Sequence, residues 1–189
     1  MNINMDTIIK DSDAHLRDKS VPVSLPLSEA DKNTLMELLT YVKESTDPEL
    51  AEAKNLRPAV GIAAIQIGIP KQLLAVVVDE EDKNGNPVHY EYALANAKIV
   101  SQSVQNSYLK TGEGCLSVLD DHPGYVIRSA RIKVKGYDML QDREVTFRAS
   151  GYVAIVLQHE IDHFSGILFY DRINPSDPYA PVENAIVIE

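Results

Sequence analysis

The chain has 189 residues, of which 44% are hydrophobic and 24% charged, a composition that excludes disordered and membrane-spanning classes. Its formal net charge of −10, from 18 basic and 28 acidic residues, repels phosphate backbones and argues against direct nucleic-acid binding. The single cysteine, Cys115, excludes an internal disulfide, and the N-terminus has no leader pattern. We therefore expect a single domain over residues 1–189, cytoplasmic and without membrane contact.

Two helices are predicted in the first third of the chain. Ser28 precedes a run in which apolar residues recur at helical spacing, which predicts a capped helix over residues 29–45. Pro48 is typical of a first helical turn, so a short second helix is expected to run from there to Asn55.

Strands are predicted through the middle of the chain. The branched apolar run 73–78 indicates a buried strand, and Asn84-Gly85 indicates the tight turn that follows it. Further strands are expected at residues 88–94, 97–108, 131–137 and 143–148. In the third of these segments apolar residues and lysines alternate, which predicts one buried and one exposed face.

A late apolar helix is expected from about Gly151 to Phe164. Ser150 is in place to cap its N-terminus, and Gly166 occupies the left-handed position that ends helices. Strands on either side of such a helix indicate an α+β fold. Antiparallel and mixed β-sheets would pack around this central helix, with another helix near the N-terminus.

This late helix carries the segment His159-Glu160-Ile161-Asp162-His163. At about 100° per residue the two histidines lie one turn apart on one face, so both imidazoles can reach one ion. Glu160 flanks that face, where a carboxylate can move a proton without binding the metal. Paired histidines alone more often pack or face solvent, but the whole pattern favours a metal hydrolase and leaves its substrate open.

A catalytic metal site needs a third protein ligand, for which Cys115 is the candidate. It lies in Gly112-Glu113-Gly114-Cys115-Leu116-Ser117, where glycines allow close backbone approach and present amide groups to a ligand. Two other readings of this cysteine stay open at this point, a small buried hydrophobe and a nucleophile paired with a histidine.

Three segments, in this order, resemble the peptide deformylase family. They are Val60-Gly61-Ile62-Ala63-Ala64-Ile65-Gln66, Glu113-Gly114-Cys115-Leu116-Ser117 and Gln158-His159-Glu160-Ile161-Asp162-His163. Tyr125-Val126-Ile127-Arg128 and the segment 169–174 resemble the longer type 2 form of Gram-positive bacteria. The resemblance covers most of the chain. It implies co-translational removal of the N-formyl group from the initiator methionine of nascent proteins, with release of formate.

The resemblance also implies a role for each site residue. Three residues would bind one divalent metal ion, namely Cys115, His159 and His163. A water on that ion would attack the formyl carbon, with Glu160 as general acid and base. Gln66 and the amide of Leu116 would stabilise the charge that forms on the formyl oxygen.

Substrate contacts follow from the same resemblance. The peptide backbone would pair with Val60, Gly61 and Gly114. The methionine side chain would enter an apolar pocket containing Ile155 and Val156, for which core packing is an equally good account.

The metal and its surroundings are only partly defined by the sequence. One thiolate and two imidazoles suit Zn(2+), Fe(2+), Ni(2+) or Co(2+), and the resemblance favours Fe(2+) in the cell with zinc as a common replacement. Glu113 and Arg128 would form an ion pair that braces the cysteine loop. Asp162 is either a support for the histidines or a solvated charge.

Three positions depart from the family pattern: Ala59 replaces a usual glycine, Ile65 a usual proline, and Ala97 a usual Asn-Pro. Because Ile65 restores a backbone N–H that needs a partner, a looser turn before Gln66 and reduced or altered activity are expected. Two alternatives to a full deformylase are a metallopeptidase with a carboxylate as third ligand, and a weakly active or non-catalytic paralogue that binds formyl peptides.

The expected partners are N-formylmethionyl nascent peptides. The acidic, apolar ending at residues 181–189 is no basic arm for ribosomal RNA, so ribosome docking through it is not expected. Transient ribosome contact by another surface is compatible with the sequence.

Overall fold

The computed structural model describes residues 2–189 and contains three α-helices within them. These are α1 (Glu29–Ser45), α2 (Pro48–Lys54) and α3 (Gly151–His163), with 3-10 turns at η1 (Ala14–Arg17), η2 (Ala64–Ile67) and η3 (Phe169–Arg172). Ser28 caps α1 through a hydrogen bond from the Asp31 amide, as predicted. None of the described helices has the length and apolarity needed to cross a membrane.

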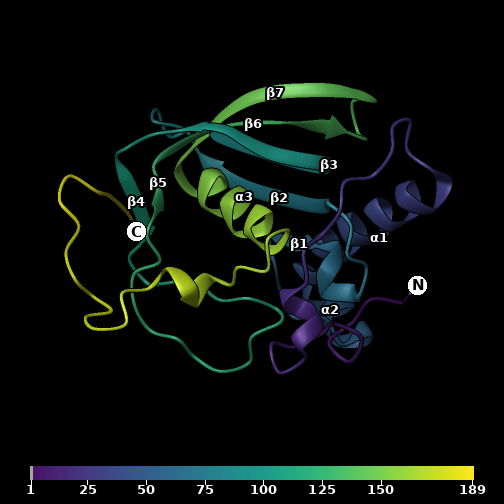
Figure 1. Ribbon diagram of the computed structural model, residues 1–189, viewed down its shortest axis with the longest axis horizontal. Coiled ribbons are helices and arrows are strands. Elements are labelled where there is room, and N and C mark those ends of the chain that lie inside the picture. The colour runs from purple at the N-terminus through teal and green to yellow at the C-terminus, as the bar shows by residue number, and fades with distance from the viewer. Residues whose placement is uncertain (1) are drawn as a thin grey trace.

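The strands form two sheets (Figure 1). The larger is antiparallel in the order β1-β2-β3-β6-β7, from β1 (Gly61–Ala63), β2 (Leu73–Glu81), β3 (Pro87–Gln102), β6 (Arg131–Asp138) and β7 (Arg143–Ser150). The smaller has the order β5-β4-β8, from β4 (Asn106–Leu109), β5 (Arg128–Ser129) and β8 (Ile186–Ile188). Because β4 and β8 run parallel, this sheet is mixed and the predicted α+β fold is confirmed.

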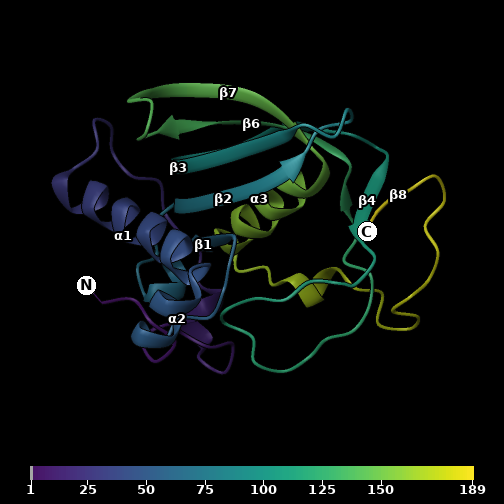
Figure 2. The ribbon, with the colours of Figure 1, turned by 180° about the vertical axis from the view of Figure 1, so that it is seen from behind.

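The large sheet is covered by a helix on each face. Along β2, Leu74, Val76 and Val78 belong to the cluster that contains α3, whereas Leu73 and Ala75 belong to the cluster that contains α1. Figures 1 and 2 show α3 and α1 on opposite sides of β2. With both faces of β2 buried, the strand reads as a continuous apolar run instead of an alternating one.

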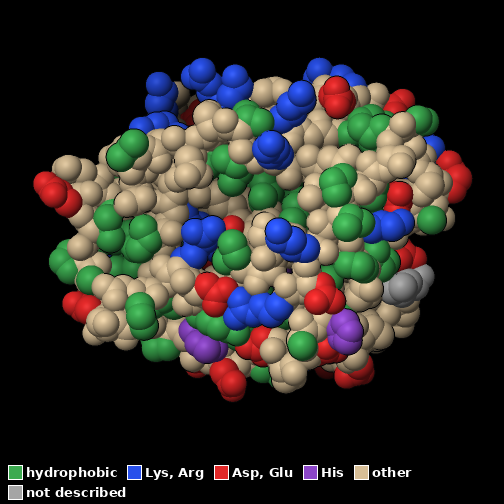
Figure 3. Space-filling view, in the orientation of Figure 1, with side chains coloured by type: hydrophobic (Ala, Val, Ile, Leu, Met, Phe, Trp, Pro, Cys, Tyr) green, Lys and Arg blue, Asp and Glu red, His purple; other side chains and the backbone are tan. Residues whose placement is uncertain are grey.

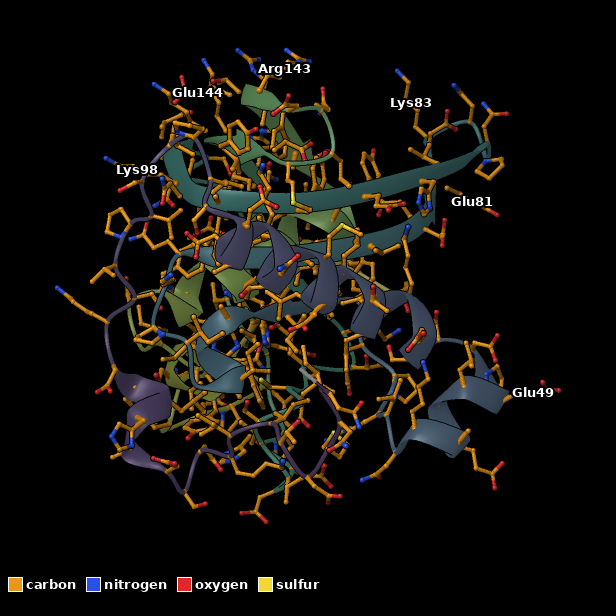
Figure 4. The ribbon with its side chains drawn as sticks, turned by 90° about the vertical axis from the view of Figure 1, so that its right-hand side faces the viewer. Glu49, Glu81, Lys83, Lys98, Arg143 and Glu144 are labelled. Atoms are coloured by element: carbon orange, nitrogen blue, oxygen red, sulfur yellow. The ribbon has the colours of Figure 1, made fainter. Side chains whose placement is uncertain are left out.

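Strands β6 and β7 extend beyond this double cover. Exposed Arg131 and Lys135 alternate with buried Ile132 and Val134, as the sequence predicted. Lys and Arg side chains gather along this upper edge of the molecule (Figure 3). Lys98 and Arg143 project from the same end of the sheet, beside Glu144 (Figure 4).

The predicted strands 88–94 and 97–108 are wrong in their division. The first continues into the second as β3, with an irregularity at Asn96, whose φ of 55° lies in the left-handed region. The break comes later, where the Ser103 hydroxyl donates to the Gln105 carbonyl at 2.7 Å. Gly136 faces the irregularity, and a Cβ there would lie 3.1 Å from Cα of Ala97. Sequence periodicity does not reveal a bulge of this kind.

The ends of α3 are held differently from each other. Ser150 occupies the N-cap position, but its side chain makes no capping hydrogen bond, and the Glu80 carboxylate from β2 accepts from the Tyr152 and Val153 amides instead. Burial raises the pKa of Glu80, and these two hydrogen bonds oppose the rise. At the other end Gly166 has a φ of 70°, as predicted for a left-handed cap.

We predict that Gly166→Ala lowers the unfolding free energy by about 2–4 kcal/mol. A Cβ at this position would lie 2.2 Å from the Arg17 carbonyl oxygen, in addition to the cost of a left-handed φ. Urea unfolding measures the loss. Gly85→Ala is the control, because Gly85 has a φ of 79° with nothing within 4 Å of a Cβ, and should cost only about 1 kcal/mol. Equal losses in the two variants would show that the contact with Arg17 does not matter.

Candidate metal centre

Two distant segments bring the three predicted metal ligands together. His159 and His163 come from α3, and Cys115 comes from the loop that follows β4. Their ligand atoms all lie within 4.8 Å of one another, and Sγ of Cys115 is 3.6 Å from Nε2 of His163. A tetrahedral ion with bonds of about 2.0–2.3 Å separates its ligand atoms by roughly 3.5 Å. The group therefore has the spacing and the donor types of a catalytic site.

The His159 ring is oriented by a neighbouring carboxylate. Nδ1 of His159 lies 2.9 Å from Oε1 of Glu113, which leaves Nε2 to face the ligand group. The Phe169 ring stacks over this imidazole at 6.2 Å between centroids. A histidine that binds metal through one nitrogen and a carboxylate through the other has a fixed tautomer and ring angle.

A buried chain of charges supports the ligands from behind. Arg128 donates to Glu113 at 2.8 and 2.9 Å and to Asp162 at 2.9 Å, and its side chain is 1% exposed. Asp162 also accepts from Arg172 at 2.6 and 2.7 Å. The predicted pair between Glu113 and Arg128 is thus present. Asp162 was expected to be either a support for the histidines or a solvated charge, and in the structure it forms ion pairs with Arg128 and Arg172.

The local charges favour a cation at this point. Burial lowers the pKa of His159, but hydrogen bonds with Cys115 and Glu113 outweigh it and hold that pKa well above its usual value. Burial, together with the neighbouring His159, lowers the pKa of His163. Burial would raise the pKa of Glu113, yet its hydrogen bonds with His159 and Arg128 bring it down to about 2. His163 is thus neutral, as a ligand must be, and a cation bound at this point would replace the proton on His159.

Glu160 differs from Glu113 in having no hydrogen-bond partner among the described residues. It is 4% exposed, and its Oε2 accepts no hydrogen bond from any residue in 2–189. Burial raises the pKa of Glu160 to about 7. A carboxyl with that pKa takes up and releases protons near neutral pH, which is what a general acid and base requires.

Gln66 is fixed at both ends of its amide. Oε1 accepts from the Ala63 backbone N–H at 2.9 Å, while Nε2 lies 3.1 Å from the Ser117 hydroxyl and 3.5 Å from Sγ of Cys115. Because a backbone N–H is only a donor, the amide oxygen must face Ala63 and the NH₂ group must face the ligands. Ile65, beside it, is 2% exposed and packs in the α3 cluster.

A cavity of about 430 Å³ opens beside the ligand group. Every residue predicted for the site lines it except His163, which lies behind and is 1% exposed. Ile155 and Val156 both line the cavity and belong to the core. The structure is therefore compatible with a pocket for the methionine side chain and with core packing. β1 is the edge strand of its sheet and, within residues 2–189, pairs with β2 alone. An extended chain has a free strand edge to pair with there.

Sequence reasoning missed two residues of this site. Ser117 contacts the Gln66 amide, and Arg57 lines the cavity mouth. Ser117 ends the segment 113–117 that resembles the family, and its position two residues after Cys115 could have indicated its role. Arg57 lies just before the first motif, in a loop without periodicity, and only the folded chain places it.

The chain is similar to proteins of known family. The model of the polypeptide deformylase family matches residues 5–179. Peptide deformylase 2 of Geobacillus stearothermophilus is 55% identical over 186 residues, which cover 98% of each chain. Peptide deformylase 2 of Bacillus subtilis (strain 168) is 50% identical over 187 residues, which cover 99% of each chain.

Solved structures agree with the sequence comparison. The peptide deformylase of Thermus thermophilus has a TM-score of 0.68 and 29% identity, with 90% of this chain and 86% of that chain covered. A Met-Ala-Ser-bound class I type b peptide deformylase from Acinetobacter baumannii also has a TM-score of 0.68 and 29% identity, with 92% and 100% covered.

We predict that Arg128→Leu lowers the unfolding free energy by about 3–5 kcal/mol, because it leaves the buried carboxylate of Glu113 without its arginine and removes one of the two arginines from Asp162. Arg172→Leu is the matched control. It removes a second guanidinium from the same Asp162, but the Arg172 side chain is 39% exposed, so the loss should be about 1 kcal/mol or less. Urea unfolding of both variants, each stripped of metal with a chelator, gives the comparison. Similar losses of unfolding free energy in the two variants would show that burial of the Arg128 ion pairs does not make them more important than the exposed pair of Arg172.

Proposed function

Because the chain belongs to the polypeptide deformylase family, we propose that it hydrolyses the N-formyl group of N-formylmethionyl peptides through the site described above. The roles proposed for the individual residues rest on one observation. Cys115, His159 and His163 converge beside a buried, unpaired Glu160 and a Gln66 amide whose NH₂ faces them. A metallopeptidase with a carboxylate ligand fits less well, since Glu113, the carboxylate beside His159, is engaged by Arg128 and His159.

The group that holds a divalent cation would be Cys115, His159 and His163. A cation bound by these three supplies Lewis acidity and makes hydroxide available near neutral pH. Their donor set suits iron(II), zinc, nickel and cobalt alike. We propose iron(II) as the ion in the cell, following the family resemblance, with the others as replacements.

Glu160 is the proposed carrier of the proton. The reaction consumes one water, breaks the bond between the formyl carbon and nitrogen, and yields formate and a free amine. Glu160 takes a proton from the water and passes it to the departing nitrogen. Its pKa of about 7 makes both steps accessible at neutral pH.

Gln66 and the Leu116 amide are the proposed donors to the formyl oxygen. The Gln66 amide is held by Ala63 before substrate arrives, so no reorganisation is needed as charge develops on that oxygen. Both residues line the cavity. Loss of one such donor typically costs about 10²–10³ in rate.

The substrate is proposed to bind as an additional strand on the free edge of β1. Val60, Gly61 and Gly114 all line the cavity there. Gly61 is required for a close approach, because a Cβ on it would lie 2.8 Å from Oε1 of Glu160. The methionine side chain would contact Ile155 and Val156.

Partners beyond the peptide follow from the same reaction. Nascent formylated chains are cytoplasmic, and we place the enzyme there as a single catalytic domain over residues 1–189. The C-terminal segment is not a free arm, since Ile186–Ile188 pair with β4 and Glu189 bonds to Lys110 at 2.8 Å. Any ribosome contact would use another surface.

The test of this function is formate release from formyl-Met-Ala-Ser by anaerobically prepared protein, with metal analysis on the same sample. We expect stoichiometric formate and free N-terminal methionine. Glu160→Ala should keep its metal and lose at least about 10²-fold in rate. Cys115→Ser should lose metal or bind it far more weakly.

Other outcomes point to the alternatives. A non-catalytic paralogue would release no formate with either wild type or Glu160→Ala. A metallopeptidase with a carboxylate ligand would keep its metal in Cys115→Ser and cleave the peptide after methionine.

The departure at Ile65 gives a further prediction. Ile65 lies in the 3-10 turn η2, whose backbone angles suit proline, so Ile65→Pro should restrict the turn that presents Gln66. We expect kcat on formyl-Met peptides to rise about two- to fivefold, the range expected from restricting one residue. Ile65→Val keeps the backbone N–H and trims the same buried side chain, so it reports the packing effect alone. Unchanged turnover in the proline variant would count against the expectation that isoleucine in place of proline at this position reduces activity.

A further inference from the structure

Arg57 is a positive charge at the mouth of the catalytic cavity. Within residues 2–189 it is the only Lys or Arg that lines this cavity. Its side chain reaches the loop of the cysteine ligand, since Nη2 lies 3.9 Å from where a Cβ on Gly114 would be. The guanidinium therefore lies beside the path proposed for the substrate backbone.

The backbone that carries Arg57 is firmly held. The Tyr41 hydroxyl lies 3.1 Å from the Arg57 carbonyl oxygen and 3.2 Å from its amide nitrogen, and Tyr41 is 2% exposed. Two residues on, the Ala59 amide donates to the hydroxyl of buried Ser45 at 3.1 Å. Both anchors come from α1. The loop between α2 and β1 is thus fixed before any ligand binds, which reduces the entropy lost on binding.

The Arg57 guanidinium itself has no partner. In the described part of the chain it makes no hydrogen bond or ion pair, whereas eight other Lys or Arg side chains pair with carboxylates. The two carboxylates of the cavity cannot serve it. Glu113 is held by Arg128, and Glu160 is buried at 4% exposure. Glu44, which precedes the anchor Ser45 in α1, is paired with Lys54.

We propose that Arg57 is a specificity residue that favours formyl-Met peptides with a carboxylate at their third residue. This inference rests on the proposed function. An extended peptide advances about 3.3 Å per residue. The formyl group would lie at the metal ligands, and the Arg57 guanidinium lies close to Gly114, the residue before the ligand Cys115. The guanidinium is therefore within reach of a side chain a few peptide residues after the formyl group. A planar guanidinium at this distance binds carboxylates in preference to amides or ammonium groups.

The test compares formyl-Met-Ala-Glu, formyl-Met-Ala-Gln and formyl-Met-Ala-Lys, each amidated at its C-terminus so that only the third side chain differs in charge. In wild type we expect kcat/KM to be about three- to fivefold higher for Glu than for Gln at low salt, the range of one exposed ion pair. The difference should lie in KM and shrink in 0.5 M salt. Lys should be the poorest substrate.

Arg57→Gln should bring the Glu-to-Gln ratio of kcat/KM to about 1, and Arg57→Lys should retain part of the preference. Arg148→Gln is the matched control, because it removes one exposed positive charge from β7, outside the cavity. It should preserve the wild-type ratio.

Equal ratios in wild type and Arg57→Gln, or an equal drop in Arg148→Gln, would overturn the proposal. The first would mean that the Arg57 stem only covers apolar surface. Turnover of the Gln peptide keeps the proposed function intact in either case. No formate from any of the three peptides would overturn both together.

Discussion

The site depends on how Arg128 joins two parts of the chain that are far apart in sequence. Its buried guanidinium binds Glu113, two residues before the cysteine ligand, and Asp162, one residue before the second histidine ligand. Glu113 in turn holds the ring of His159. A buried ion pair gives little net stability by itself, because desolvation offsets the attraction. Its contribution here is positional, since the loop and the helix cannot shift without separating buried charges.

Two carboxylates beside the same histidine have opposite properties because their surroundings differ. Glu113 has its charge matched by Arg128 and His159, so its pKa falls to about 2 and it stays ionised. Glu160, one helical position after His159, has no such partner, and burial raises its pKa to about 7. When the surroundings of two carboxyl groups in one site shift their pKa values in opposite directions, the group with the lowered pKa stays ionised and the group with the raised pKa can transfer protons. The hydrogen bonds from His159 and Arg128, which reach Glu113 and not Glu160, make the difference.

Much of the site could be predicted because its chemistry is local in sequence. Helical spacing alone placed His159, Glu160 and His163, and the expected ends of α1 and α3 agree with the structure. The β1 strand could not be found by periodicity, since it has three residues and all are buried. Neither could the cap that Glu80 supplies to α3 from another strand. Such contacts depend on tertiary placement, to which a local pattern does not respond.

The three departures from the family pattern lie where the structure has its own support for the backbone. Ala59 donates to Ser45, which anchors the loop that a glycine usually occupies. Ala97 sits in the irregularity of β3 against Gly136, where its small side chain is accommodated by the missing Cβ across the sheet. At Ile65 burial of the side chain and the hold of Ala63 on Gln66 supply part of the restraint that proline would add. Backbone rigidity in this part of the chain thus comes from tertiary contacts with α1 and the core. The contacts of Tyr41 and Ser45 in α1 fix the backbone that carries Arg57, whereas the Ala63 amide fixes Gln66, so α1 supports a part of the cavity lining that carries none of the metal ligands.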